Sequence, residues 1–208
     1  MKYLSQVPLI GILRGIGTGS IEATVKAAMD GGFRTLEITL NRQEAFDQIS
    51  KIKSRFGREI QLGAGTVLTV DAASKAIAAG AEFIVTPALV PEVIEFCKNQ
   101  AIPVFPGAMT PTEILAAHQA GAEMVKVFPA SCLGPAYIRS LKGPFPEIGL
   151  IPTGGVTLES VPQYFQAGAS ALGIGGELFK KEWVENKNWA EIGKTARNYV
   201  NAAKRNRD

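Results

Sequence analysis

The residue whose position most directly suggests chemistry is a lysine inside an apolar run. Lys126 lies in AEMVKVFPA, where Met124 and Phe128 share its parity. In a desolvated site the charged form of an amine is disfavoured, and a neutral lysine amine can attack a carbonyl carbon and form an imine. Lys126 is therefore the candidate Schiff-base nucleophile. A structural ion pair, or a lysine that reaches solvent from a strand end, is the alternative.

A glutamate with a similar placement is the second candidate. Glu37 lies in FRTLEITL, where Phe33 and Thr35 share its parity and the aliphatic residues have the opposite parity. If the aliphatic set packs beneath helices, Glu37 points into the same interior as Lys126. A buried carboxyl group near an imine can move protons during a reaction. Its alternative role is the same ion pair, with Lys126 as its partner.

Groups that can bind an anion follow three other apolar runs. Arg14 follows PLIGIL and offers a planar guanidinium to a carboxylate or a phosphate. Glycine turns can present peptide N–H groups to a phosphate, and the segment 177–181 is expected to begin a helix whose dipole favours an anion. The glycines concerned, in PTGGV and GIGG, are Gly154, Gly155, Gly175 and Gly176.

The composition argues against several other kinds of site and partner. The 208 residues include two cysteines and one histidine, too few for a structural zinc site and unfavourable for a Ser-His or Cys-His pair. Acidic residues do not cluster in the sequence, so a metal site is not expected. The net charge is +3, with the basic residues gathered in a tail at 204–207, and this pattern does not favour nucleic-acid binding. No apolar run is long enough for a membrane span, and no secretion signal occurs, so a cytoplasmic protein is expected.

A repeated change from helix to strand organises the chain. Four times a helix-like run ends in a glycine and continues into an apolar run, with these glycines at positions 32, 80, 121 and 168. A second apolar run lies inside each interval. Eight strands are therefore predicted, and they start near residues 7, 33, 60, 81, 102, 122, 148 and 169.

Eight such units predict a (β/α)8 TIM barrel. It would form a single domain over residues 1–208, with a C-terminal helix at about 188–204. Runs such as LIGIL and EFIVT are continuously apolar, as is typical of parallel strands buried on both faces. An open, doubly wound sheet is the alternative fold. In a barrel the active site lies at the carboxyl ends of the strands, where the candidate residues are found.

These motifs resemble those of a known family. The chain is similar to the Schiff-base aldolases that cleave 2-keto-3-deoxy-6-phosphogluconate (KDPG) or its galactonate epimer (KDPGal). The similarity covers roughly residues 5–180 in order, through PLIGILRGI, TLEITLN, GAGTVL, IVTPAL, PVFPGAMTPTE, VKVFPAS, GPFP, PTGGV and GIGG. It implies a (β/α)8 barrel, a homotrimer, and a reaction without metal or organic cofactor.

The resemblance also implies a role for each matched residue. Lys126 matches the lysine that forms the imine, Glu37 matches the general acid and base, and Arg14 would hold the substrate carboxylate. Positions that line the substrate pocket match Thr66, Pro87, Phe128 and Thr153. The phosphate-binding loops match Gly154, Gly155, Gly175 and Gly176.

The implied substrate is a phosphorylated keto acid, KDPG or KDPGal or both, cleaved to pyruvate and glyceraldehyde 3-phosphate. Within the aldolases, cleavage of 4-hydroxy-2-oxoglutarate to pyruvate and glyoxylate is the alternative. A phosphate-binding barrel of another activity, in which Lys126 would not react with pyruvate, is a further alternative. The last alternative is a barrel that binds sugar acids without catalysis.

Two positions depart from the family pattern. Gluconate-type members carry an arginine where this chain has Asn41, and its own Arg42 lies one residue later. Family members often carry a serine in the last phosphate loop, where this chain reads Gly175-Gly176-Glu177. The loop therefore lacks a hydroxyl donor and gains a carboxylate.

We expect phosphorylated substrates to exceed their dephosphorylated forms in kcat/KM by about tenfold or more, and Glu177→Ser to widen this preference. The substitution adds a hydrogen-bond donor and removes a negative charge, and a hydrogen bond to a charged group contributes roughly 1.5–3 kcal/mol. Steady-state kinetics on both forms measures the ratio. Equal values on the two forms would contradict the phosphate assignment and leave the imine chemistry intact.

Overall fold

Residues 1–205 are described by a computed structural model; residues 206 and 207 of the basic tail lie outside the described residues. The strands are β1 (Leu9–Leu13), β2 (Thr35–Thr39), β3 (Gln61–Gly65), β4 (Ile84–Val85), β5 (Val104–Phe105), β6 (Gly107–Ala108), β7 (Val125–Val127), β8 (Leu150–Pro152) and β9 (Leu172–Ile174). A strand lies at each of the eight predicted places. The fifth is divided into β5 and β6 at Pro106, which has no N–H to donate to a neighbouring strand.

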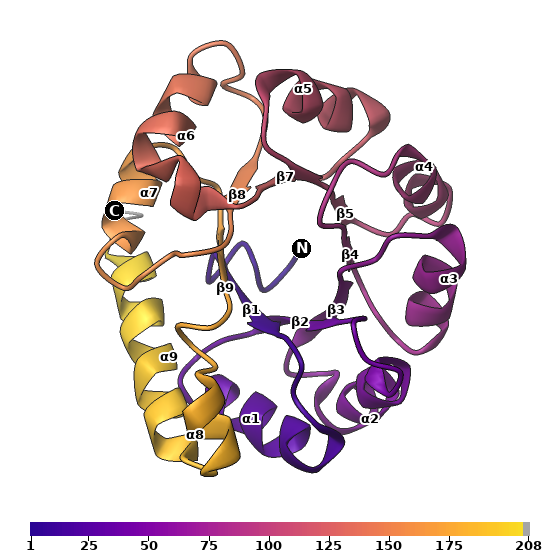
Figure 1. The fold of residues 1–208 in the computed structure, drawn as a ribbon, viewed down its shortest axis with the longest axis vertical. Coiled ribbons are helices and arrows are strands. Elements are labelled where there is room, and N and C mark those ends of the chain that lie inside the picture. Colours follow the sequence, from indigo (N-terminus) through magenta and orange to yellow (C-terminus); the bar gives the residue numbers. More distant parts are fainter. Residues whose placement is uncertain (206–208) are drawn as a thin grey trace.

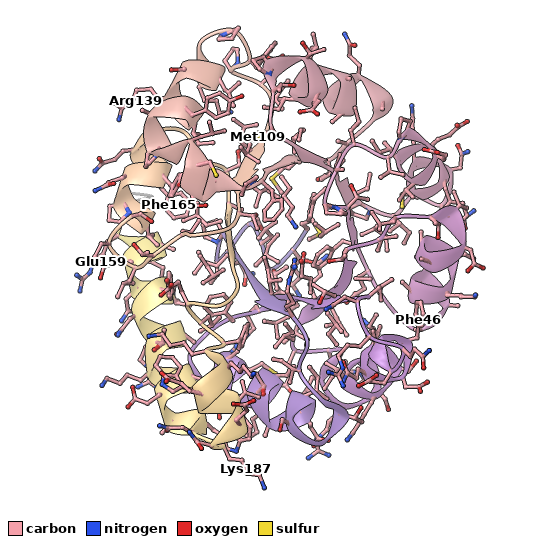
Figure 2. All side chains as sticks on the ribbon, viewed as in Figure 1. Phe46, Met109, Arg139, Glu159, Phe165 and Lys187 are labelled. Carbon is pink, nitrogen blue, oxygen red and sulfur yellow. The ribbon has the colours of Figure 1, made fainter. Side chains whose placement is uncertain are left out.

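Helices connect the strands and form an outer layer (Figure 1). They are α1 (Thr18–Asp30), α2 (Ala45–Phe56), α3 (Val70–Ala78), α4 (Pro91–Asn99), α5 (Pro111–Ala120), the 3-10 turn η1 (Ala130–Cys132), α6 (Gly134–Lys142), α7 (Val161–Gln166), α8 (Lys181–Glu185) and α9 (Trp189–Lys204). Charged side chains such as Arg139, Glu159 and Lys187 point away from the molecule (Figure 2). Within the described residues, no helix has the length and apolar character that a membrane span needs.

The strands pair in parallel and form two sheets that adjoin each other at both ends. One sheet has the order β5-β4-β3-β2-β1-β9, and the other has the order β6-β7-β8. A parallel bridge between Thr153 and Gly173 links β8 to β9, and Pro106 alone separates β5 from β6. The strands surround a central space, with the helices outside them (Figure 1). This arrangement directs the carboxyl ends of all strands toward one rim.

Buried side chains form two clusters, one on each face of the strands. The larger lies between strands and helices and includes Leu9, Leu36 and Ile49. The smaller lies in the central space and consists of Leu4, Ile10, Phe83, Val85, Phe105, Ile151 and Ala171. Because successive residues of a strand point to opposite faces, one strand can contribute to both clusters.

The N-terminal segment fills the amino end of the central space. Leu4 and Ala171 are buried in the inner cluster, and Met1 and Met124 pack against it. Met124 and Ala171 directly precede β7 and β9. Figure 1 shows the N-terminus in the middle of the ring of strands. The apolar filling leaves the carboxyl ends of the strands as the end at which a ligand can enter.

The inward parity of Glu37 does not extend to Phe33, and the predicted helix start after Gly176 is wrong. Phe33 packs in the outer cluster with Leu36, because it precedes β2 and the strand alternation begins only at Thr35. The helix predicted from Glu177 does not begin there. The N–H groups of Leu178 and Phe179 both donate to the Gly175 carbonyl and close a single turn, and α8 starts only at Lys181. The buried side chain of Phe179 turns the chain into the core between these two points.

Helices α1 and α9 approach each other closely at two glycines. A Cβ atom on Gly31 would overlap the Ala196 side chain and lie 2.6 Å from the Gly193 carbonyl oxygen. Trp183 and Trp189 are half-buried and pack against the outer cluster, as anchors of the C-terminal region. The absence of side chains at the two glycines therefore determines how near α9 can lie to α1.

Gly31→Ala is expected to lower the free energy of unfolding by about 1–3 kcal/mol, because a methyl group in a filled site forces the two helices apart. Gly19→Ala in the first turn of α1 is the matched control, since nothing lies within 4 Å of its added methyl group. It should stabilise the protein by up to about 1 kcal/mol through helix propensity. Urea denaturation measures both changes, and a neutral Gly31→Ala would contradict the close approach.

Candidate active site

The two candidate reacting residues lie in the middle of strands and point into the central space. Lys126 is the central residue of β7 and Glu37 is the central residue of β2. Their side chains are 4% and 2% exposed, respectively. The flanking residues Val125 and Val127 belong to the outer cluster, so strand alternation turns Lys126 inward.

Lys126 and Glu37 line the same small internal space but do not form an ion pair. Neither residue belongs to an ion pair within 4 Å among the residues that the structure describes. The Nζ atom of Lys126 lies 5.2 Å from the centre of the Phe128 ring. The Oε1 atom of Glu37 is buried and has no hydrogen-bond partner among residues 1–205. The structure therefore favours two groups available to a substrate over the alternative of a structural salt bridge.

The environment of Glu37 changes its proton affinity. Burial raises the pKa of its carboxyl group above the ordinary value, and the positive charges of Lys126 and Arg14 offset part of this effect. Gly65 on the neighbouring strand β3 provides the room, because a Cβ atom there would lie 2.5 Å from Oε1 of Glu37. A carboxyl group with a raised pKa and a free oxygen is suited to exchange protons with a bound substrate.

A larger cavity of about 440 Å³ opens above this space at the carboxyl ends of the strands. It shares Ile12, Thr153 and Gly173 with the Lys126–Glu37 space, so the two form one site. Seven predicted residues line it: Arg14, Phe128, Thr153, Gly154, Gly155, Gly175 and Gly176. Glu177 also lines it, so a residue with a negative charge borders the site.

The glycine loops present unused hydrogen-bond donors. Gly154 and Gly155 have φ values of +89° and +73°, which L side chains rarely adopt. In the described part of the chain, no acceptor receives the N–H groups of Gly155, Gly176 and Glu177. These loops can therefore bind an anion without a helix N-terminus.

Arg14 is held at the mouth of β1 by a residue that the sequence analysis missed. The side chain of Gln48 on α2 is 3% exposed, and its Nε2 atom donates a hydrogen bond of 2.9 Å to the Ile16 carbonyl. This bond fixes the loop that follows Arg14. A polar residue on the otherwise apolar buried face of α2 is the signal that could have revealed it.

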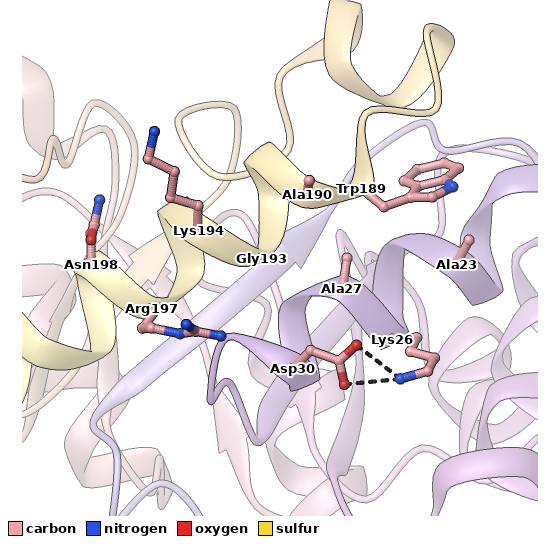
Figure 3. Close-up of a pocket in the computed structure, with 10 residues that line it drawn as sticks. All are labelled: Ala23, Lys26, Ala27, Asp30, Trp189, Ala190, Gly193, Lys194, Arg197 and Asn198. Atoms are coloured by element: carbon pink, nitrogen blue, oxygen red, sulfur yellow. Dashed lines mark hydrogen bonds and ion pairs between the residues drawn. The ribbon is translucent and has the colours of Figure 1, made fainter.

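Another cavity, of about 530 Å³, lies elsewhere (Figure 3). It is a groove between α1 and α9 with small residues such as Ala27 and Gly193, beside the ring of Trp189. Two of its charged side chains, Lys26 and Asp30, are bonded to each other. It is remote from the strand ends and holds no free pair of reacting groups. In residues 1–205, no three histidine, cysteine or carboxylate side chains gather as a metal site requires.

Comparison with known proteins identifies the family of the chain. The family model described as "KDPG and KHG aldolase" matches residues 1–195. The chain belongs to this aldolase family. It is 38% identical to the 2-dehydro-3-deoxy-6-phosphogalactonate aldolase of Escherichia coli (strain K12), over 86% of this chain and 88% of that one.

Solved aldolase structures superimpose on the chain. One, described as "Native KDPGal structure", gives a TM-score of 0.91 at 35% identity and covers 97% of this chain and 96% of its own. The KDPG aldolase from Legionella pneumophila, with pyruvate captured as a covalent carbinolamine, gives a TM-score of 0.87 at 25% identity and covers 95% and 96%.

Four residues that the family resemblance singled out lie outside both spaces of the site. Thr66 and Pro87 are half-buried at the carboxyl ends of β3 and β4, on the same rim, but line neither space. The Oδ1 atom of Asn41 accepts a hydrogen bond of 2.5 Å from the Thr39 hydroxyl. Arg42, which lies one residue after the family's arginine position, forms a surface ion pair with Glu44 at 2.7 Å.

Glu37→Gln is expected to stabilise this family member at neutral pH. Because the folded-state pKa of Glu37 is raised, ionisation weakens folding as the pH rises through that pKa. Below the unfolded-state value of 4.5 the carboxyl group is neutral in both states, and the difference should vanish. The Tm of both proteins near pH 4 and near pH 8 tests this. Glu95→Gln, at an exposed position on α4, is the control. A Tm gain for Glu37→Gln that does not depend on pH would contradict the link between Glu37 ionisation and stability.

Proposed function

We propose that the chain is a class I aldolase, a carbon–carbon lyase acting on KDPG, KDPGal or both. It would release pyruvate and glyceraldehyde 3-phosphate through a Schiff base on Lys126. One observation carries this proposal: a buried, unpaired lysine and a buried carboxylate with a free oxygen share one space, which opens to a cavity with free N–H donors. The names of the relatives agree with this substrate class.

In the proposed reaction, the Lys126 amine adds to the C2 ketone of the substrate and loses water to form a protonated imine. Glu37 takes the proton of the C4 hydroxyl. The C3–C4 bond breaks, its electron pair moves into the imine to give an enamine, and the aldehyde leaves. Glu37 returns a proton to C3, and water hydrolyses the imine to free pyruvate and Lys126. The imine itself is the electron sink, so these steps require no metal or organic cofactor.

The remaining predicted residues would bind and orient the substrate. Arg14, at the border of the cavity, would pair with the C1 carboxylate. The free N–H groups of the two glycine loops would bind the phosphate. Phe128 and Thr153 would contact the carbon chain between these ends, and Thr66 and Pro87 would complete the rim.

We also infer a closed (β/α)8 barrel as a single domain over residues 1–208. The link between β8 and β9, and the division of one strand at Pro106, support closure on both sides. A cytoplasmic homotrimer is part of this proposal. Exposed apolar side chains on the connections after β3 and β6 support association between copies; they are Leu68, Val70, Met109 and Leu115.

A second candidate activity is cleavage of 4-hydroxy-2-oxoglutarate to pyruvate and glyoxylate. The observation that favours it is Glu177, a negatively charged residue that lines the cavity that would receive a phosphate. Pyruvate release from KDPG, KDPGal and 4-hydroxy-2-oxoglutarate, compared as kcat/KM, separates the two activities.

Borohydride added with pyruvate is expected to fix a pyruvate-derived mass on Lys126, because reduction converts the imine to a stable amine. Peptide mass spectrometry locates the label. Lys126→Ala should lose the label and reduce turnover by about 10³-fold or more. Labelling at another lysine, or none, would refute the aldolase assignment.

Glu37→Gln separates imine formation from proton transfer. It should still be labelled at Lys126, but exchange of the pyruvate methyl protons should slow by about 10²–10⁴-fold. Proton NMR in deuterated water follows the exchange. Wild-type exchange in this variant would assign the base to another group.

A further inference from the structure

A lysine that the sequence analysis did not assign lines the glycine cavity. Lys181 is the first residue of α8 and contributes to the wall of the 440 Å³ cavity. It also lines an adjoining cavity of about 370 Å³, which shares Arg14 and Phe179 with the first. Lys181 therefore lies where the two cavities meet, near the glycine loop that follows β9.

The local fold explains why the side chain lies there. The turn closed on the Gly175 carbonyl and the buried side chain of Phe179 hold the chain next to the loop after β9. Two residues later, Lys181 begins α8. The turn that replaces the predicted helix start thus brings a lysine to the cavity in place of a helix dipole.

The ammonium group of Lys181 is available to a ligand. Its ion-pair partner in the described residues is Glu185, at 3.6 Å, and the two side chains are 87% and 62% exposed. Exposed pairs of this kind contribute little to stability. The Nζ atom can therefore turn from Glu185 to an anion in the cavity at small cost.

Electrostatics at this end of the cavity leave a role for a cation. The peptide N–H groups of the loops carry no net charge, and Glu177 adds a negative charge among the lining residues. Of the two cations that line the cavity, Arg14 is assigned to the substrate carboxylate. A phosphate dianion beside Glu177 would otherwise lack a compensating side-chain charge.

We infer that Lys181 binds the terminal phosphate of the substrate and determines the preference for phosphorylated substrates. In this chain the lysine would compensate for the serine hydroxyl that the loop lacks and for the carboxylate of Glu177. The inference rests on the proposed function, because it assigns a residue to the phosphate of that substrate.

Lys181→Met tests the inference with Lys180→Met as the matched control. The Nζ atom of Lys180 lies 4.8 Å from the centre of the Trp183 ring, and Lys180 lines neither cavity. Lys181→Met should lower kcat/KM for KDPG and KDPGal by about tenfold, mainly through KM, because one charge-assisted contact is lost. It should leave kcat/KM for the dephosphorylated keto acids unchanged, and Lys181→Arg should restore most of the loss. Lys180→Met should behave as wild type on both kinds of substrate.

Equal losses on phosphorylated and dephosphorylated substrates, or no loss on either, would overturn the inference. Binding of inorganic phosphate, measured by calorimetry, gives a readout independent of turnover, and Lys181→Met should weaken it by a similar factor. Labelling of Lys126 by pyruvate and borohydride should be unaffected by Lys181→Met. If the wild-type protein is not labelled at Lys126, the proposed function is refuted. Unchanged phosphate binding in Lys181→Met would refute this inference alone.

Discussion

The site depends on two ionisable side chains that are kept desolvated and unpaired in an apolar interior. Burying a carboxylate and an amine is costly, and a close salt bridge between them would occupy both groups. Among the described residues the two groups do not form such a pair. Glu37 and Lys126 project from β2 and β7, which belong to different sheets and are not neighbours. The strands therefore hold both groups ready for a substrate that lies between them.

The apolar filling and the small residues of the interior serve the same constraint. Leu4 and the rest of the inner cluster exclude water from the amino end of the central space. Gly65 leaves room for the Glu37 carboxyl group, and a Cβ atom on Gly173 would overlap the side chain of Thr153. Residues without reactive groups thus determine where the polar side chains can point.

The two ends of the site are built differently. The reacting groups lie within strands, where pairing fixes the register, as for Lys126 opposite Gly107 and Ile151. The anion-binding end lies in the loops after β8 and β9, where backbone conformation and a single turn direct the N–H groups. A different residue in these loops, such as Glu177 of this chain, can change which substrate is preferred without disturbing the strands that carry the reacting groups.

The sequence by itself determined the eight strands, their parallel character and the inward direction of Lys126 and Glu37. These follow from local patterns, namely glycine after a helix and alternation within a strand, which act over a few residues. The tertiary structure decided that Phe33 packs outward and that the chain after Gly176 turns before α8, because both depend on contacts with distant core residues. It also decided that Lys126 and Glu37 share a space without pairing. That arrangement depends on the spacing of strands far apart in the chain, which no local pattern encodes.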